Sequence, residues 1–346
     1  MVVPRRGGPD SPPKGFPHMA SSHGRGLVHL AAALDQPSAS DARPYVEAAR
    51  LAERGGLDFV TLDDTLARPG LDPLTVLSRV APATGRIGLV PTVTSTHPEL
   101  FRVLAAVATL DRVSRGRAGW RIDGSTTGAE ARLLGRRPAA PAGPLRGETG
   151  EVADVAAKPC DVREDDTEIR DMPNGGPRPP HGHPVRVVDA TDEPARRTAA
   201  RYADVALVRA ASAAQAAAVR DQLRATAAEF GRRPDELRVL AGLLVDLGDG
   251  EHAAAPGHGG GGPRQTAQGP LYRGGPVDLA ALIATWHGEG VVDGFHLTPA
   301  EPLRDLERLV NGTVALLQHR GLFRTFYPGS TLREHLDLAV PAHRCG

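Results

Sequence analysis

The chain has 346 residues with 41 basic and 41 acidic side chains, so its formal net charge is zero. A balanced charge provides no attraction to nucleic acid or to an anionic membrane surface, and neither partner is predicted. The two cysteines, Cys160 and Cys345, lie far apart in the sequence and indicate a reduced protein without a disulfide framework.

The first segment, residues 1–26, is rich in Pro, Gly, Ser and His. It lacks the apolar core of a signal peptide, and nothing in the chain approaches a span of about 20 apolar residues. We therefore predict a disordered leader over residues 1–26, a single folded domain over residues 27–341 and a cytoplasmic location.

Eight apolar runs of strand length follow the leader and alternate with segments of helical period. The predicted strands are Leu27–Leu34, Asp58–Leu62, Ile87–Val93, Arg117–Ile122, Val185–Asp189, Asp204–Val208, Leu237–Leu247 and Val292–Leu297. The predicted helices are Asp41–Arg54, Asp72–Ala83, Pro98–Val113, Glu193–Tyr202, Ser212–Phe230, Pro276–Gly290 and Pro302–His319. Alternation of this kind is typical of β/α units around a parallel sheet, and eight units predict an α/β fold of the TIM (β/α)8 barrel type.

Two segments interrupt the alternation and are predicted to be irregular. Residues 136–184 have Pro-rich ends and an acidic run, and residues 248–275 form a Gly/Pro/His tract without apolar period. Long irregular segments in a compact barrel are usually functional loops or disorder. The first one follows the fourth strand, at the end of the barrel where active sites lie.

Two carboxylates, Asp63 and Asp64, end the second predicted strand. Neighbouring carboxylates can serve acid–base chemistry, because like charges raise one of the two pKa values. Adjacent strand residues point to opposite faces, so at most one of them faces the barrel mouth. We predict that this is Asp63, and loop capping is the explanation for Asp64.

Polar clusters also follow the third and fourth strands. Thr92 and the run Thr94–His97 end the third strand, where capping of a helix beginning at Pro98 is the alternative to cofactor binding for Thr96 and His97. The fourth strand leads into Trp120-Arg-Ile-Asp-Gly-Ser125. Arg121 could hold a phosphate or a carboxylated substrate there, or face solvent.

Several blocks of sequence match a known pattern. They read Arg86-Ile-Gly-Leu with Thr94-Ser-Thr96 and Pro98, then Thr109-Leu-Asp-Arg-Val-Ser-Arg-Gly-Arg-Ala-Gly-Trp120, and near the C-terminus Gly290–Leu297 and Leu317–Leu336. This order resembles the bacterial luciferase-like flavin monooxygenases, in particular the subgroup with nitrilotriacetate and dibenzothiophene-sulfone monooxygenases. The resemblance implies a luciferase-like TIM barrel whose usual large insertion after strand four is shortened here.

The resemblance also implies a cofactor, reduced FMN, supplied by a separate flavin reductase, with O2 as co-substrate. Thr94 and His97 would position the flavin ring, and Asp63 would lie beside it. Asp123 and Ser125 are candidates for replacing polar contacts of the family. Trp120 is a further candidate for the cofactor site, although a core position is the more common explanation for such a tryptophan and the two roles are compatible.

The phosphate motif departs from the family pattern. Members carry Gly-Ser-Ser-x-x-Gly after strand five, where helix N–H groups hold the flavin phosphate. This chain reads Asp189-Ala-Thr-Asp-Glu-Pro-Ala195, in which Thr191 retains one hydroxyl. The carboxylates are unfavourable beside a phosphate, so either other groups such as Arg209 or Arg186 hold the phosphate, or flavin binds weakly.

We therefore predict an FMN-dependent monooxygenase that oxidises a small organic substrate with O2, without assigning a catalytic residue. An F420-dependent oxidoreductase of the same fold and a degenerate, non-catalytic barrel are the alternatives. No metal site is predicted, because the histidine pairs 181/183 and 252/258 lack partners at metal-ligand spacing. The resemblance is compatible with a homo-oligomer.

Overall fold

The computed structural model describes residues 26–36, 40–64, 70–94, 100–123, 183–248 and 262–339. The predicted leader, apart from Gly26, and most of the predicted irregular segment 136–184 lie outside these ranges. The same holds for His97 and Ser125, and for the side chains of Thr94 and Asp123.

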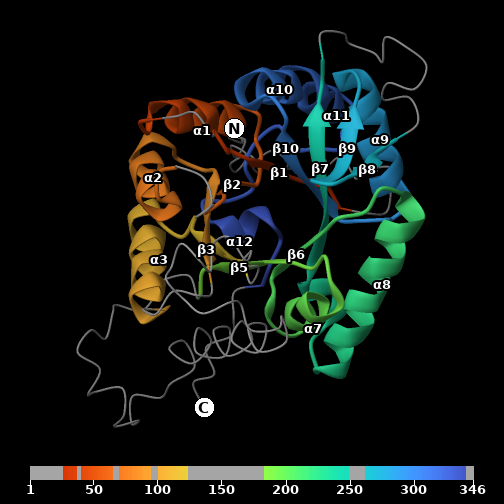
Figure 1. Ribbon diagram of the computed structural model, residues 1–346, viewed down its shortest axis with the longest axis horizontal. Helices are drawn as coiled ribbons and strands as arrows, with labels where there is room; N and C mark the ends of the chain where they lie inside the picture. Colours follow the sequence, from red (N-terminus) through yellow and green to blue (C-terminus); the bar gives the residue numbers. More distant parts are fainter. Residues whose placement is uncertain are drawn as a thin grey trace, which may run out of the picture.

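Eight parallel strands form a closed barrel (Figure 1). The ring follows the chain order and closes because the last strand pairs with both the first and the seventh barrel strand. All eight predicted strands are confirmed. They are β1 (His29–Ala33), β2 (Phe59–Leu62), β3 (Gly88–Thr94), β4 (Gly119–Asp123), β5 (Val185–Asp189), β6 (Val205–Val208), β7 (Arg238–Asp246) and β10 (Gly294–Pro299).

Helices surround the barrel on its outer side, as Figure 1 shows. Several begin where the sequence predicts a cap: Ser212 accepts the N–H of Gln215, and Pro276 and Pro302 occupy first-turn positions. The helices are α1 (Arg43–Arg54), α2 (Pro73–Val80), α3 (Leu100–Ser114), α7 (Glu193–Tyr202), α8 (Ala213–Glu229), α9 (Pro276–Gly288), α10 (Pro302–Arg308), α11 (Ala315–His319) and α12 (Leu332–His335). None of the helices in the described ranges is long and apolar enough to cross a membrane.

The barrel interior is apolar toward the amino-terminal ends of the strands. Side chains of β1, β2, β3, β5, β6 and β7 form one buried cluster there with Leu332, Leu336 and Leu338. The backbone of this C-terminal segment bonds to strand starts, since the Leu332 N–H donates to Gly116 O and Arg238 Nε donates to Leu336 O. Helix α12 and the residues after it therefore close the amino-terminal end of the barrel.

Barrel closure depends on a glycine at the start of β10. A Cβ atom at Gly294 would overlap the carbonyl oxygen of His29 and lie 2.6 Å from Leu240 Cδ2. The strands thus approach one another too closely for any side chain at this position, which explains why the sequence has glycine there.

The structure differs from the sequence prediction within residues 248–275. Strands β8 (Arg264–Thr266) and β9 (Gly269–Arg273) form a short antiparallel hairpin, and β9 also pairs with the end of β7. The turn uses Gly269 at φ 126°, and the Tyr272 side chain is buried. The two strands are too short to produce a visible apolar period, so the sequence did not reveal them.

Candidate active site

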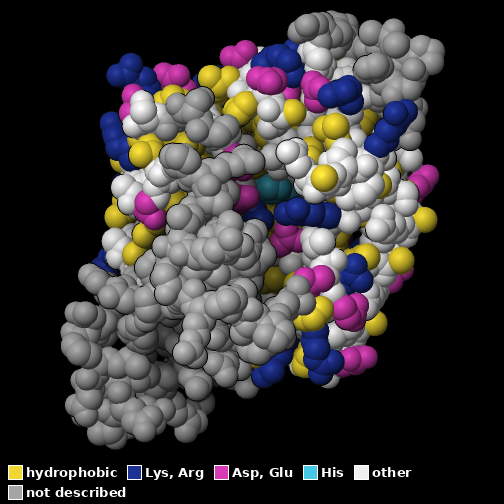
Figure 2. Space-filling view, viewed as in Figure 1, with side chains coloured by type: hydrophobic (Ala, Val, Ile, Leu, Met, Phe, Trp, Pro, Cys, Tyr) yellow, Lys and Arg dark blue, Asp and Glu magenta, His cyan; other side chains and the backbone are white. Residues whose placement is uncertain are grey.

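The carboxyl-terminal ends of the barrel strands meet around a small cavity of about 170 Å³. Figure 2 shows a hollow in this face with a histidine inside it and acidic and basic side chains around it. We call this cavity the mouth. Its charged and titratable lining residues are Asp35, Asp63, Arg121, Asp189, Arg209 and His296.

Strand alternation explains why these residues face inward. Phe59 belongs to the apolar cluster inside the barrel, and Thr61 and Asp63 follow it at steps of two, so all three share one face of β2. Val187 and Asp189 on β5 show the same spacing. The interior therefore changes from apolar at the amino-terminal end to charged at the mouth.

Arg121 links two carboxylates across the mouth. Its Nη1 lies 2.6 Å from Asp63 Oδ1, and its Nη2 lies 3.6 Å from Asp189 Oδ2. Asp189 Oδ2 also accepts a hydrogen bond from Arg209 Nη2 at 2.8 Å, and Asp63 accepts one from the Thr92 hydroxyl at 2.9 Å. The side chain of Arg121 is 7% exposed, whereas that of Arg209 is 42% exposed.

The pKa values of two neighbouring carboxyl groups move in opposite directions. The Asp63 N–H donates to Asp35 Oδ1 at 3.0 Å, so the two residues are in contact. Burial, followed by the charge of Asp63, raises the pKa of Asp35 to about 6. Burial also acts to raise the pKa of Asp63, but Arg121 and the Thr92 hydrogen bond outweigh it and lower this pKa. Such a separated pair is typical of acid–base sites.

His296 lies below these carboxyl groups on β10. A hydrogen bond of 2.8 Å joins its Nε2 to Thr61 Oγ1, and its ring stacks on Phe59. Burial, and then the positive charge of Arg121, lower the pKa of His296 to about 4. The imidazole is therefore neutral at pH 7 and can donate or accept one hydrogen bond on either nitrogen.

The structure brings only some of the predicted cofactor residues to the mouth. Asp63 lines it, whereas the buried Trp120 and the exposed Thr191 do not. The backbones of Thr94 and Asp123 pair at the ends of β3 and β4. Their side chains, His97 and Ser125 lie outside the description, so these assignments stay predictions.

Three mouth residues were missed by sequence reasoning: Asp35, Asp189 as a mouth carboxylate, and Gln268. Asp35 follows β1 and Asp189 ends β5, the same position at a strand end that identified Asp63 on β2. A uniform search of every strand end would have found both carboxylates. Gln268 belongs to the unexpected hairpin turn and had no such signal.

One N–H group at the N-terminus of α7 is already bonded to an acidic residue. Asp192 Oδ1 accepts the Ala195 N–H at 3.0 Å, and Glu193 lies in the first turn. The Thr191 hydroxyl donates to Asp189 Oδ1. The Ala195 N–H and the Thr191 hydroxyl, two groups that could hold a phosphate at this helix, therefore have carboxylate partners instead.

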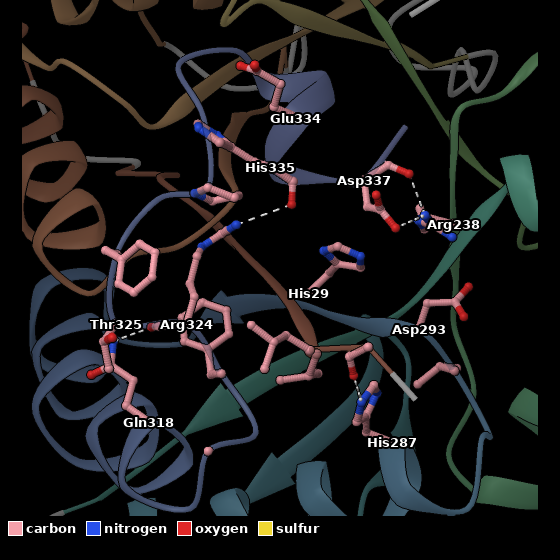
Figure 3. A pocket seen from close by; sticks show the side chains of 18 residues that line it. His29, Arg238, His287, Asp293, Gln318, Arg324, Thr325, Glu334, His335 and Asp337 are labelled. Carbon is pink, nitrogen blue, oxygen red and sulfur yellow. Dashed lines mark hydrogen bonds and ion pairs between the residues drawn. The ribbon is translucent and has the colours of Figure 1, made fainter. Parts of the chain in front are cut away.

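A larger cavity of about 690 Å³ lies at the opposite, amino-terminal end (Figure 3). Figure 3 shows Arg238 bonded to Asp337 and Arg324 bonded to the backbone of His335. Arg324 Nη2 also lies 2.6 Å from Oδ1 of the fully buried Asp58. Among the described residues, no group of three or more His, Cys, Asp or Glu side chains could hold a metal ion.

Comparisons with known proteins agree with this architecture. Nitrilotriacetate monooxygenase component A of Aminobacter aminovorans is 28% identical, with 88% of this chain and 91% of that protein covered. Dibenzothiophene-sulfone monooxygenase of Rhodococcus erythropolis is 23% identical, with 86% and 90% covered.

Solved structures share the fold. EDTA monooxygenase (EmoA) from Chelativorans sp. BNC1 superimposes with a TM-score of 0.75 at 20% identity, covering 90% of this chain and 98% of that one. The coenzyme F420 dependent tetrahydromethanopterin reductase from Methanopyrus kandleri gives a TM-score of 0.63 at 15% identity, covering 84% and 99%.

The family model described as luciferase-like monooxygenase matches residues 24–269, which is well over half of the chain. The matched range contains seven of the eight barrel strands and five of the six charged or titratable residues at the mouth. The fold, the position of the site and the sequence match agree: the chain belongs to the luciferase-like monooxygenase family.

Proposed function

We propose that the protein is a monooxygenase that binds reduced FMN at the mouth and oxidises a small organic substrate with O2. The observation that carries this proposal is the mouth itself: paired carboxylates, guanidinium groups and a neutral histidine lie at the carboxyl-terminal end of a barrel of this family. The family relatives named above are monooxygenases of small organic compounds.

The donor set at the mouth fits the polar edge of a flavin ring. That edge alternates carbonyl oxygens with an N–H group, and so requires both donors and acceptors. Arg121 supplies donors, Asp63 and Asp35 supply carboxyl oxygens, and His296 supplies either. When bound, the reduced flavin supplies the electrons that activate O2 for transfer of one oxygen atom.

The protein's own residues would bind, orient and move protons. Arg121 and Thr92 fix the Asp63 carboxylate, and Arg121 is itself held by Asp63 and Asp189. Asp35, with its pKa near neutrality, can hold a proton at Oδ2 below pH 6 and release it above. His296 stays neutral and presents its ring to the cavity between them.

A separate flavin reductase would supply the reduced cofactor. One relative is named component A of its monooxygenase, and two others are named subunits A and B of pristinamycin IIA synthase, so relatives act with further components. The absence of a family-type phosphate site at α7 agrees with a cofactor that is exchanged rather than retained.

One observation favours a second candidate, a barrel that has lost catalysis. The Asp192 cap occupies the helix N-terminus that holds the phosphate in the family pattern. Such a barrel would bind neither reduced FMN nor F420.

An anaerobic titration with reduced FMN, and in parallel with reduced F420, separates these functions. The proposal predicts a dissociation constant for reduced FMN in the micromolar range or below. It further predicts substrate-dependent O2 consumption when a flavin reductase and candidate polycarboxylates or sulfones are added. Exclusive binding of F420 would instead favour the F420-dependent oxidoreductase, and no binding of either would favour the non-catalytic barrel.

A further inference from the structure

We propose that Arg209, rather than the N-terminus of α7, holds the phosphate group of the flavin. This inference rests on the proposed function, because it assumes that reduced FMN binds at the mouth. It assigns to this chain a phosphate ligand at a position different from the family motif after strand five.

The α7 N-terminus is unsuited to a phosphate. The Ala195 N–H, one of the helix donors, already bonds to the Asp192 carboxylate at 3.0 Å. The Thr191 hydroxyl donates to Asp189, and Glu193 adds a further negative charge in the first turn. A phosphate placed there would lie near three carboxylates and would have to displace Asp192 from the Ala195 N–H.

Arg209, in contrast to the α7 N-terminus, offers a partly exposed positive charge to a phosphate. It directly follows β6, lines the mouth, and keeps its side chain 42% exposed. The other arginine that lines the mouth, Arg121, is 7% exposed and is held between Asp63 and Asp189. Arg186, the alternative raised by the sequence, bonds to Asp204 near the starts of β5 and β6 and lies away from the mouth.

Two glycines give the Arg209 side chain room to move. A Cβ atom at Gly242 would lie 3.8 Å from Arg209 Cγ, and one at Gly269 would lie 3.8 Å from Arg209 Cδ. The stem therefore rests on bare backbone on two sides. No side chain from these two positions limits a rotation of the guanidinium group from Asp189 toward a ligand.

The ion pair between Arg209 and Asp189 shows that an anion can lie beside the Arg209 guanidinium group. The Asp189 carboxylate receives Arg209 Nη2 at 2.8 Å and the Thr191 hydroxyl, and it lies 3.6 Å from Arg121 Nη2. A partly exposed ion pair of this kind is weak in water. A phosphate carries more charge and more acceptor oxygens than a carboxylate, so it can compete for the guanidinium group.

Comparing two flavins isolates the phosphate contact. Dissociation constants of reduced FMN and reduced riboflavin, which lacks the phosphate, are measured by anaerobic equilibrium dialysis. The proteins are the full chain, Arg209→Gln, Arg209→Lys and the control Arg273→Gln. Arg273 is also a partly exposed arginine at this end of the barrel, pairs with Asp246 at 2.9 Å, and does not line the mouth.

We expect the full chain to prefer reduced FMN over reduced riboflavin. Arg209→Gln should raise the dissociation constant of FMN about tenfold or more and leave that of riboflavin unchanged, because a charge-assisted hydrogen bond is lost. Arg209→Lys should retain part of the preference, and Arg273→Gln all of it. Circular dichroism of each variant checks that the fold is kept.

Two results would overturn the inference alone. One is an equal affinity of the full chain for both flavins, and the other is a preference for FMN that survives in Arg209→Gln. If the full chain binds neither reduced flavin, the proposed function itself fails and this inference falls with it. The two failures are thus distinguished by whether the full chain binds any reduced flavin.

Discussion

The two ends of the barrel use charged residues in different ways. At the amino-terminal end, the buried carboxylate of Asp58 accepts the Leu30 N–H at 2.7 Å and lies 2.6 Å from Arg324 and 3.3 Å from His29. Asp204 is surrounded in the same way by Arg186, Arg333 and His183. At the mouth, Asp35 and Asp63 face a cavity together and share fewer positive partners.

This difference appears in the directions of the pKa shifts. Burial favours the protonated form at both ends, but at the amino-terminal end the surrounding donors outweigh it, and the pKa values of Asp58 and Asp204 are both lowered. At the mouth, the pKa of Asp63 is lowered while that of Asp35 is raised. The larger cavity therefore lies beside carboxylates whose charge is balanced by several donors. The smaller cavity lies beside a carboxyl pair with separated pKa values, as is typical of acid–base sites.

The largest expected effect on stability comes from Asp58→Asn. This change leaves the Arg324 guanidinium buried without its counter-charge, so we expect the free energy of unfolding to fall by about 3–5 kcal/mol. The matched change at the mouth is Asp63→Asn, where Arg121 retains Asp189 and the loss should be smaller. Urea denaturation of both variants measures the difference. Equal losses would contradict the contrast between the two ends.

A second pair of variants compares glycines at the two ends. Gly294→Ala should lower the free energy of unfolding by about 3 kcal/mol or more, because its Cβ would overlap the His29 carbonyl oxygen. Gly242→Ala is the control, since its Cβ would meet ordinary contacts at 3.7 and 3.8 Å. Thermal unfolding should show a lower Tm only for Gly294→Ala, and a stable Gly294→Ala protein would show that the barrel closes less tightly than described.

Asp35→Asn should stabilise the protein in a pH-dependent way. The folded pKa of about 6 lies above the ordinary value of 3.8, so protonation of Asp35 favours folding, and this contribution is lost as pH rises from about 4 through 6. Removing the carboxylate should therefore raise the unfolding free energy by about 1–2 kcal/mol at pH 8, after allowing for screening by solvent. At pH 4 the variant and the unchanged protein should have nearly equal stability, as measured by urea denaturation. A gain that is the same at both pH values would contradict the assignment.

The smallest expected effect concerns the N-terminal cap of α7. Asp192→Ser keeps a capping oxygen but removes a negative charge three residues after Asp189, the partner of Arg209. We expect the affinity for reduced FMN to rise about two- to fivefold, in line with the usual strength of charge effects at helix ends, and the affinity for reduced riboflavin to stay unchanged. An equal gain for both flavins would show that the carboxylate acts on the ring site instead.

The fold could be predicted from the sequence because its signals are local. Each of the eight barrel strands is an apolar run bounded by polar residues, and first-turn prolines such as Pro276 and Pro302 mark helix starts. The hairpin at residues 264–273 escaped prediction because its strands, of three and five residues, are too short to show an apolar period.

The site could be predicted only in part. Position at a strand end identified Asp63, but the same rule was not applied to Asp35 or Asp189, and the buried Trp120 does not line the mouth. The ion pairs among Asp63, Arg121, Asp189 and Arg209 join side chains of different strands that meet at the mouth. Sequence spacing carries no information about such contacts between different strands.

The central claim, that reduced flavin binds at the mouth, can be tested by amide hydrogen exchange under anaerobic conditions with and without reduced FMN. The account predicts slower exchange in segments around the mouth, residues 34–36, 209–212 and 267–269, and no change in residues 325–330 beside the amino-terminal cavity. Protection confined to residues 325–330, or none anywhere at saturating FMN, would contradict it.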